Sequence, residues 1–221
     1  MKPKVGVVLS GCGVYDGAEI HESVLTILAL DRAGAEAVCL APDVAQRHVV
    51  NHLTGQPAEG ESRNVLVEAA RIARGKVRSL ADFDPASLDA LVLPGGFGAA
   101  KNLCDFAFRG ADCDVHPDVA RVVRAVHAAG KPVGAVCIAP VILAKLLGAE
   151  KPKLTIGTDA GTAAAIGKMG GEHVSCGGGG AVVDAERRLV TTPAYMLDSP
   201  ISEVSVGIEK LVAELLAMVR R

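Results

Sequence analysis

Residues 132–140, with the sequence PVGAVCIAP, decide the fold, because a short apolar strand there passes through one cysteine into a helix. Residues 133–136 are typical of a buried strand, and residues 141–147 have helical apolar spacing. A chain that turns from strand to helix within one residue strains that residue's backbone and raises its side chain above the sheet edge. We therefore expect Cys137 to be a nucleophile held at the edge of an α/β sheet.

The composition predicts one domain, spanning residues 1–221, with an aliphatic core. Half of the residues are hydrophobic, only 3% are aromatic, and the 25 glycines imply many tight turns. This length is sufficient for a single well-buried core. Such a composition suits a mostly parallel sheet covered by helices on both faces.

Charge and cysteine usage exclude several classes of protein. The net charge is −2 and no basic stripe appears, so we expect no nucleic-acid partner. No apolar run approaches the roughly 20 residues of a membrane span, and residues 1–4 lead into a strand without a signal peptide. The six cysteines lack the spacing of a disulfide framework or a zinc site. We expect a cytoplasmic protein with free thiols, no metal and no membrane contact.

Strand-like segments alternate with helical ones, which indicates βαβ units in a doubly wound sheet. The predicted strands are residues 5–9, 37–40, 88–93, 133–136 and 154–156, and the predicted helices are residues 20–33, 117–129, 141–147, 162–169 and 201–219. Residues 181–183 and 189–191 predict a small hairpin. The irregular residues 43–74 predict an insertion, helical at 65–72, that covers part of the site or of a subunit surface.

Three loops follow predicted strands at the edge where ligands of open α/β sheets bind. They are residues 10–17, residues 94–98 and the turn at Cys137. The Gly95-Gly96 pair lets the backbone approach a ligand and present an amide to an oxyanion. The following helix favours the Cys137 thiolate by lowering its pKa. Glu22 and Glu19 both begin a helix near this edge, and their spacing alone does not choose the proton carrier.

Several motifs resemble the PfpI-type superfamily of cysteine glyoxalases, deglycases and peptidases. They are GAVCIAP at 134–140, LVLPGG at 91–96 and a glutamate ahead of Arg32-Ala33-Gly34, whose register selects Glu22. Longer motifs resemble the ElbB branch of isoprenoid-biosynthesis-associated glyoxalases. These are SGCGVYDGAEIHE at 10–22, NHLTG at 51–55, GGFGAAKNL at 95–103 and TTPAYML at 191–197.

The resemblance implies a flavodoxin-like sandwich, a homodimer, and a glutathione-independent lyase that acts on small aldehydes without a cofactor. Cys137 would add to glyoxal, Glu22 would carry a proton, and water would release glycolate. The residues expected to bind the oxyanion or substrate are Gly95, Gly96, Ile138, Cys12 and Thr158. Many superfamily members have a histidine near position 158, and its absence here makes amide cleavage a weaker prediction.

Two other interpretations stay open. The fold could serve as a redox-sensing or partner-binding module, with Cys137 oxidised to a sulfinic acid that is hydrogen-bonded to Glu22. Alternatively, the glycines of residues 11–17, with Asp43 after the second strand, outline a weak dinucleotide site. The histidines that folding could bring to the thiol are His21, His116 and His173.

Overall fold

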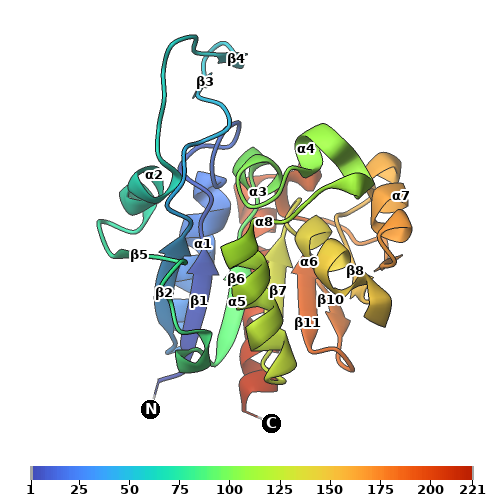
Figure 1. Cartoon of the computed structure of the whole chain (residues 1–221). Coiled ribbons are helices and arrows are strands. Elements are labelled where there is room, and N and C mark those ends of the chain that lie inside the picture. The colour runs from blue at the N-terminus through green and yellow to red at the C-terminus, as the bar shows by residue number, and fades with distance from the viewer. Residues whose placement is uncertain (1, 221) are drawn as a thin grey trace.

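The computed structural model describes residues 2–220, which form a seven-stranded sheet between layers of helices (Figure 1). The strand order is β10-β11-β7-β6-β1-β2-β5. The parallel strands are β1 (Lys4–Val8), β2 (Glu36–Ala41), β5 (Val77–Ser79), β6 (Ala90–Leu93), β7 (Val133–Val136) and β11 (Leu189–Thr192). Only β10 (Val182–Asp184) runs antiparallel, as one arm of a hairpin with β11. The predicted flavodoxin-like fold and its hairpin are confirmed.

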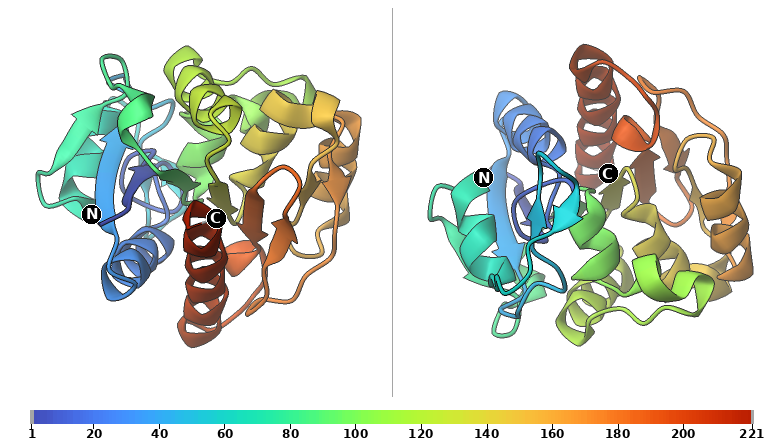
Figure 2. Two further views of the ribbon diagram at one scale, coloured as in Figure 1. Left: turned by 90° about the horizontal axis from the view of Figure 1, so that it is seen from below. Right: turned by 90° about the horizontal axis from the view of Figure 1, so that it is seen from above.

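Helices cover both faces of the sheet (Figure 2). One core cluster joins the sheet to α1 (Ile20–Arg32), α2 (Val65–Ile72) and α8 (Ile201–Val219), and the other joins it to α5 (Pro117–Ala128) and α6 (Pro140–Leu147). Along β6 the buried side chains alternate between these clusters, as the two-residue period of a strand requires. Within residues 2–220, no helix is both long and apolar enough to cross a membrane.

Short elements differ most from the sequence-based expectations. Of the strand predicted at 154–156, only β8 (Lys153–Leu154) forms, and it pairs with β9 (Glu172–His173) outside the main sheet. Helix α7 (Ala160–Lys168) starts two residues early, because the Asp159 carboxylate caps it by accepting the Thr162 N–H at 2.7 Å. Helices α3 (Phe97–Lys101) and α4 (Phe106–Arg109) were not predicted, since they are too short to show a helical period.

The insertion at residues 43–74 contains a ribbon of β3 (Val50–Asn51) and β4 (Gln56–Pro57), followed by α2. Figure 1 shows this ribbon projecting beyond the carboxyl ends of the parallel strands. Its base packs on the loop after β1, where the Asp16 carboxylate accepts the Val50 N–H at 2.8 Å. The insertion thus covers the glycine-rich loop, and its role at a subunit surface stays a prediction.

The chain changes direction across the sheet between β1 and β6. From β1 it continues to β2 on one side, and from β6 it continues to β7 on the other side. The loops that follow these neighbouring strands therefore separate and leave a crevice at the carboxyl edge of the sheet. Glu22 of α1, which follows β1, Gly95 after β6 and Cys137 after β7 meet at this crevice.

Candidate active site

Cys137 occupies a strained turn directly after β7. Its φ of +60° lies in the left-handed region, which a side chain with a Cβ rarely adopts, and its N–H is held by the Thr192 carbonyl at 2.9 Å. Helix α6 begins three residues later, at Pro140. The Cys137 residue is buried, with 7% of its surface exposed. The predicted strand–cysteine–helix turn is present.

Glu22 lies beside this thiol and is completely buried in the first turn of α1. Its Oε2 accepts the Gly95 N–H at 2.9 Å and its Oε1 accepts the Tyr195 N–H at 3.3 Å. The carboxyl group is also a hydrogen-bond partner of the Cys137 thiol. Two backbone amides therefore orient the carboxyl group toward sulfur. Of the two candidate glutamates, the structure places Glu22 at the thiol and uses Glu19 to cap α1.

Close backbone packing between two glycine-rich loops fixes the amides around the thiol. The Gly98 N–H donates to the Gly17 carbonyl at 2.8 Å, and the Glu19 N–H donates to the Gly95 carbonyl at 3.0 Å. A Cβ on Gly98 would lie 2.5 Å from Gly17 backbone atoms, so the two loops approach as only glycine allows. The N–H groups of Gly96 and Ile138 are thereby directed at the Cys137 sulfur.

Substituting Gly95 with alanine is expected to disrupt the site. The added Cβ would lie 2.4 Å from the Cys137 Cβ and 2.7 Å from the Glu22 Oε2, so one of these groups must move. We expect a loss of about 1–3 kcal/mol in the free energy of unfolding, as is typical of overpacking. Urea denaturation measures this loss, and Gly167→Ala is the matched control, because nothing lies within 4 Å of its added Cβ. Equal stability of the two variants would contradict the packing described here.

Burial is the largest influence on the pKa of both Glu22 and Cys137. It raises the pKa of Glu22 to about 8, with a further contribution from the Glu19 carboxylate. Burial also raises the pKa of the Cys137 thiol well above its ordinary value, and Glu22 adds to this increase, whereas the Gly96 and Ile138 amides oppose it. The expected lowering of the Cys137 pKa by the following helix is therefore wrong. The mutual hydrogen bond of the two groups, in which the Cys137 thiol donates to the Glu22 carboxyl, lowers the pKa of Glu22 and raises that of Cys137.

A cavity of about 440 Å³ opens above the thiol. Its walls are mostly apolar and include Phe97 from α3, Phe106 from α4, and Met196 from the turn after β11. Two carboxyl groups, of Glu19 and Asp159, also line it, whereas the lining residues include no lysine, arginine or histidine. The cavity therefore suits a small uncharged or cationic ligand better than an anion.

The structure brings most of the predicted site residues together, with two exceptions. Cys137, Glu22, Gly95, Gly96 and Ile138 are mutual neighbours. By contrast, Cys12 is not among the described residues that line the cavity. The charged groups that shift the pKa of its thiol include Glu68 and Arg71 of α2. Exposed Thr158 does not line the cavity either, whereas its neighbour Asp159 does.

Tyr195 is a site residue that sequence reasoning did not single out. It donates its N–H to Glu22, lines the cavity, and has its hydroxyl 2.9 Å from the His21 Nδ1. Its position depends on Ala194, whose φ of +44° turns the backbone after β11. The signal available in the sequence was the TTPAYML motif at 191–197, which contains this tyrosine. His21 thus contacts the tyrosine, and the cavity lining includes none of the candidate histidines.

The glycine-rich loop after β1 is filled by its own contacts. Asp16, 1% exposed, directs its carboxylate to the Val50 N–H, and the Asn102 amide donates to the carbonyls of Ser10 and Asp16 at 2.9 Å each. A pyrophosphate in this loop would meet a buried carboxylate. The loop geometry therefore argues against the dinucleotide interpretation.

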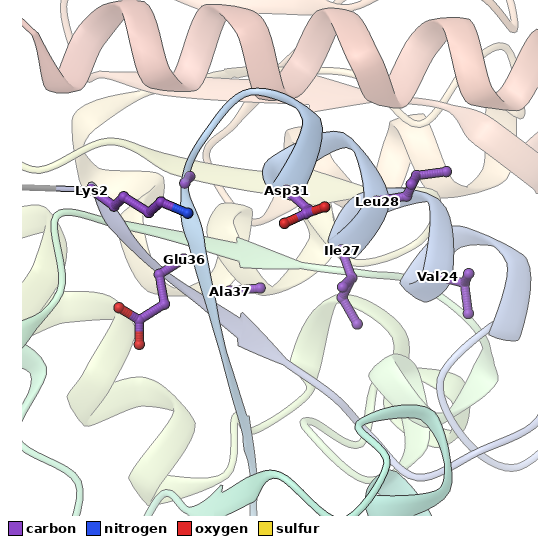
Figure 3. A pocket seen from close by; sticks show the side chains of 8 residues that line it. Lys2, Val24, Ile27, Leu28, Asp31, Glu36 and Ala37 are labelled. Atoms are coloured by element: carbon purple, nitrogen blue, oxygen red, sulfur yellow. The ribbon is translucent and has the colours of Figure 1, made fainter.

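A larger hollow, of about 650 Å³, lies between α1 and β2. Figure 3 shows Val24, Ile27 and Leu28 along α1, Asp31 near the end of this helix, and Glu36 farther off on the side of Lys2. No thiol, hydroxyl or imidazole group is among its lining residues, and its two carboxyl groups belong to exposed residues. The hollow therefore offers no nucleophile beside a buried proton carrier, as Cys137 and Glu22 provide. The smaller cavity at Cys137 is the candidate active site.

The sequence matches known proteins over most of its length. The model of the DJ-1/PfpI family matches residues 12–194. A human relative, "Glutamine amidotransferase-like class 1 domain-containing protein 3, mitochondrial", is 49% identical over 97% of this chain and 83% of its own length. The predicted cytoplasmic location is contradicted, because this relative is named as a mitochondrial protein.

Solved structures share the fold. An isoprenoid biosynthesis protein with an amidotransferase-like domain, from Ehrlichia chaffeensis, superposes with a TM-score of 0.90 at 39% identity, covering 97% of this chain and 99% of that chain. Glyoxalase III from Candida albicans superposes with a TM-score of 0.64 over 98% of this chain and 97% of that chain. Its 18% identity supports a common fold and nothing finer.

Proposed function

Because the chain belongs to the DJ-1/PfpI family, we propose that it is a glutathione-independent glyoxalase, of the ElbB-type branch, that converts glyoxal to glycolate. The observation that carries this proposal is the pairing of Cys137, on its strained turn, with the buried carboxyl of Glu22. A nucleophile and a proton carrier in contact are the two groups that the reaction requires. The residues need no cofactor for this chemistry.

The first step is addition of sulfur to the aldehyde. When the pair loses one proton, it is the Glu22 carboxyl that is ionised, because Glu22 has the lower pKa of the two. The Glu22 carboxylate then takes the Cys137 proton as the sulfur attacks one carbonyl carbon of glyoxal. The resulting alkoxide takes the Glu22 proton and becomes a hemithioacetal. The N–H groups of Gly96 and Ile138, which contact the sulfur, are placed to stabilise the charge on this oxygen.

The second step moves hydrogen between the two carbons. The Glu22 carboxylate removes the proton from the carbon bonded to sulfur, which gives an enediol, and returns a proton to the neighbouring carbon. The product is a thioester of glycolate with Cys137. Water then cleaves the C–S bond, releases glycolate and restores the thiol, so that one glyoxal and one water give one glycolate and one proton.

The cavity supports a small uncharged substrate. Glu19 and Asp159 would repel an anionic carbonyl compound, and no cationic side chain lines the cavity to bind one. Amide cleavage is less well supported, because the lining residues include no imidazole to activate the thiol or to protonate an amine. An aldehyde is already electrophilic and needs neither.

Proton NMR of glyoxal in D₂O tests the proposal directly. With the protein and no added thiol, we expect glycolate to accumulate at a rate proportional to protein concentration. Because Glu22 exchanges its proton with solvent between removal and return, part of the methylene should carry deuterium. A rate no higher than that of the heat-denatured protein would overturn the proposal.

The activity is expected to rise with pH. Reaction requires the Cys137–Glu22 pair to lose one proton, and Glu22 has its pKa raised to about 8 by burial. Below pH 8 the pair holds both protons, so kcat/KM for glyoxal should increase about tenfold per pH unit and level off above pH 8. Initial rates from pH 6 to 9.5, in buffers of constant ionic strength, measure this profile. A rate that does not change over this range would contradict it.

Oxidation of Cys137 is the second candidate function. The Glu22 carboxyl and the amides of Gly96 and Ile138 surround the sulfur with hydrogen-bonding groups, which could hold the oxygens of a sulfinic acid. Under this alternative, mild peroxide adds two oxygens to Cys137 in the wild type, and Glu22→Gln abolishes the preference for this thiol. Intact mass and peptide mapping distinguish this outcome from glycolate formation, and a protein that forms no glycolate but oxidises selectively is a sensor.

We also propose a homodimer. The exposed face of α1 carries Ile20, Val24 and Leu28 at a spacing of four residues, each at least 38% exposed. Such an apolar stripe is typical of a surface covered by another subunit. Light scattering coupled to gel filtration should give twice the monomer mass, and Val24→Glu should lower it to the monomer mass. A monomeric wild-type protein would refute the dimer.

A further inference from the structure

Two buried thiols outside the cavity, those of Cys104 and Cys113, face each other at the base of the loop that carries α4. Cys104 is 4% exposed and Cys113 is fully buried. Their sulfur atoms are hydrogen-bond partners, and the Cys104 Sγ also donates to the Ala99 carbonyl at 3.3 Å. Neither residue lines the cavity at Cys137. The proposed glyoxalase reaction therefore leaves this pair without a role.

The backbone sets this contact. Cys104 forms an antiparallel bridge with Val115, and the Asp105 N–H donates to the Asp114 carbonyl at 3.1 Å. Side chains two residues apart along extended chain lie on the same side, so Cys113 and Val115 share the side that faces Cys104. The two thiols are therefore brought together by paired backbone segments.

Cys104 borders a surface hollow, and the thiol beside it, Cys113, has a lowered pKa. Cys104 lines a surface hollow of about 250 Å³ with Lys101, Asp105 and His116. The hydrogen bond from Cys104 lowers the pKa of Cys113, and Lys145 lowers it further, although burial, Asp105 and Asp114 act in the opposite direction. A thiolate is the form that reacts with peroxide. Reagent can therefore reach the pair from the side of Cys104, and the lowered pKa of Cys113 increases the share of the reactive thiolate form there.

We propose that Cys104 and Cys113 are a redox site that forms a reversible disulfide with hydrogen peroxide. The Cys113 thiolate attacks one peroxide oxygen, the O–O bond breaks, hydroxide leaves, and a sulfenic acid forms. The Cys104 sulfur then attacks the Cys113 sulfur, its proton leaves with the hydroxyl group as water, and an S–S bond forms. The two thiols lose two electrons and peroxide gains them. A dithiol reductant reverses the reaction by exchange.

The disulfide would act on a wall of the cavity. The loop closed by Cys104 and Cys113 contains α4, whose Phe106 and Ala107 line the cavity above Cys137. A covalent link at the base of this loop restricts the movements available to α4. Formation of this disulfide uses only Cys104 and Cys113, so it does not require the protein to be a glyoxalase.

Peptide mapping tests the proposal, because trypsin separates the two cysteines. Cleavage after Lys101, Arg109 and Arg121 releases residues 102–109, with Cys104, and residues 110–121, with Cys113. The native wild-type protein and Cys137→Ala are treated with hydrogen peroxide, denatured in the presence of an alkylating reagent, and digested. We expect most of both peptides to appear as one disulfide-linked species, and dithiothreitol before alkylation to restore the two separate alkylated peptides.

Two variants identify the pairing. Cys104→Ser should leave residues 102–109 and 110–121 unlinked, whereas Cys39→Ser, which removes a buried thiol on β2, should keep the link. Circular dichroism checks that each variant is folded, and the wild-type map decides the matter if Cys104→Ser does not fold. The proposal is overturned if peroxide oxidises Cys137 while Cys104 and Cys113 are both recovered alkylated. It is also overturned if either cysteine is linked mainly to another partner.

Discussion

Replacing Cys137 with alanine is expected to abolish glycolate formation, with kcat/KM for glyoxal falling by a factor of about 10⁴ or more. The proposed reaction has no other nucleophile, because Cys137 is the only thiol among the described residues that line the cavity. Alanine keeps the Cβ and the backbone strain of the turn, so the fold should survive. Glycolate assays measure the rate, and thermal melting by circular dichroism checks the fold.

The matched control is Cys39→Ala. Cys39 is a buried thiol on β2, 7% exposed like Cys137, and burial raises its pKa to about 11. This variant removes the same sulfur atom from the core without touching the cavity, so the rate should stay within a factor of about two of the wild type. Equal rates for wild type and Cys137→Ala would refute the glyoxalase proposal.

Glu22 is expected to make the protein less stable as pH rises from 5 to 9. Burial raises its pKa from the ordinary value of 4.5 to about 8 in the folded protein. Between these values the unfolded chain releases a proton that the folded protein keeps, so the contribution to stability is complete below pH 4.5 and is lost as pH rises through 8. The difference of about 3.5 corresponds to about 5 kcal/mol, at about 1.4 kcal/mol for each tenfold change in proton affinity.

Urea denaturation of wild type and Glu22→Gln across this range measures the effect. From pH 5 to 9 the free energy of unfolding of the wild type should fall by about 4 kcal/mol relative to the variant, which has no proton to lose at this position. An exposed carboxyl provides the control, because Glu214→Gln should follow the wild-type profile. Parallel profiles for wild type and Glu22→Gln would show that Glu22 ionises as an ordinary carboxyl group.

The sequence predicts the long elements of this fold well, because their apolar patterns are local. The strands ending at Val8, Leu93 and Val136 and the helices α1, α5, α6 and α8 lie within a few residues of their predicted bounds. Elements such as α3, α4 and β9 are only two to five residues long. Contacts with the rest of the chain determine such short segments, and a periodic pattern cannot reveal them.

The candidate site also combines features that local sequence reveals with features that depend on distant contacts. Cys137 and Gly95 follow strands that the sequence reveals, so their meeting at the sheet edge could be predicted. Tyr195 contributes a backbone N–H to Glu22, and that contact depends on the turn at Ala194, which leaves no mark in residue type. The pKa of Cys137 was expected in the wrong direction because burial is a property of the whole fold and outweighs the local effect of α6.

The walls and the floor of the cavity have separate origins in the chain. Strand β7 and helix α1 supply the thiol and the carboxyl group, whereas Phe97, Phe106, Asp159 and Met196 come from four short segments outside the sheet. Exchanging a side chain in such a segment leaves Cys137 and Glu22 in place. Gene duplicates of this protein could therefore diversify in substrate while retaining one chemistry, and directed evolution for a new aldehyde should begin at these four positions.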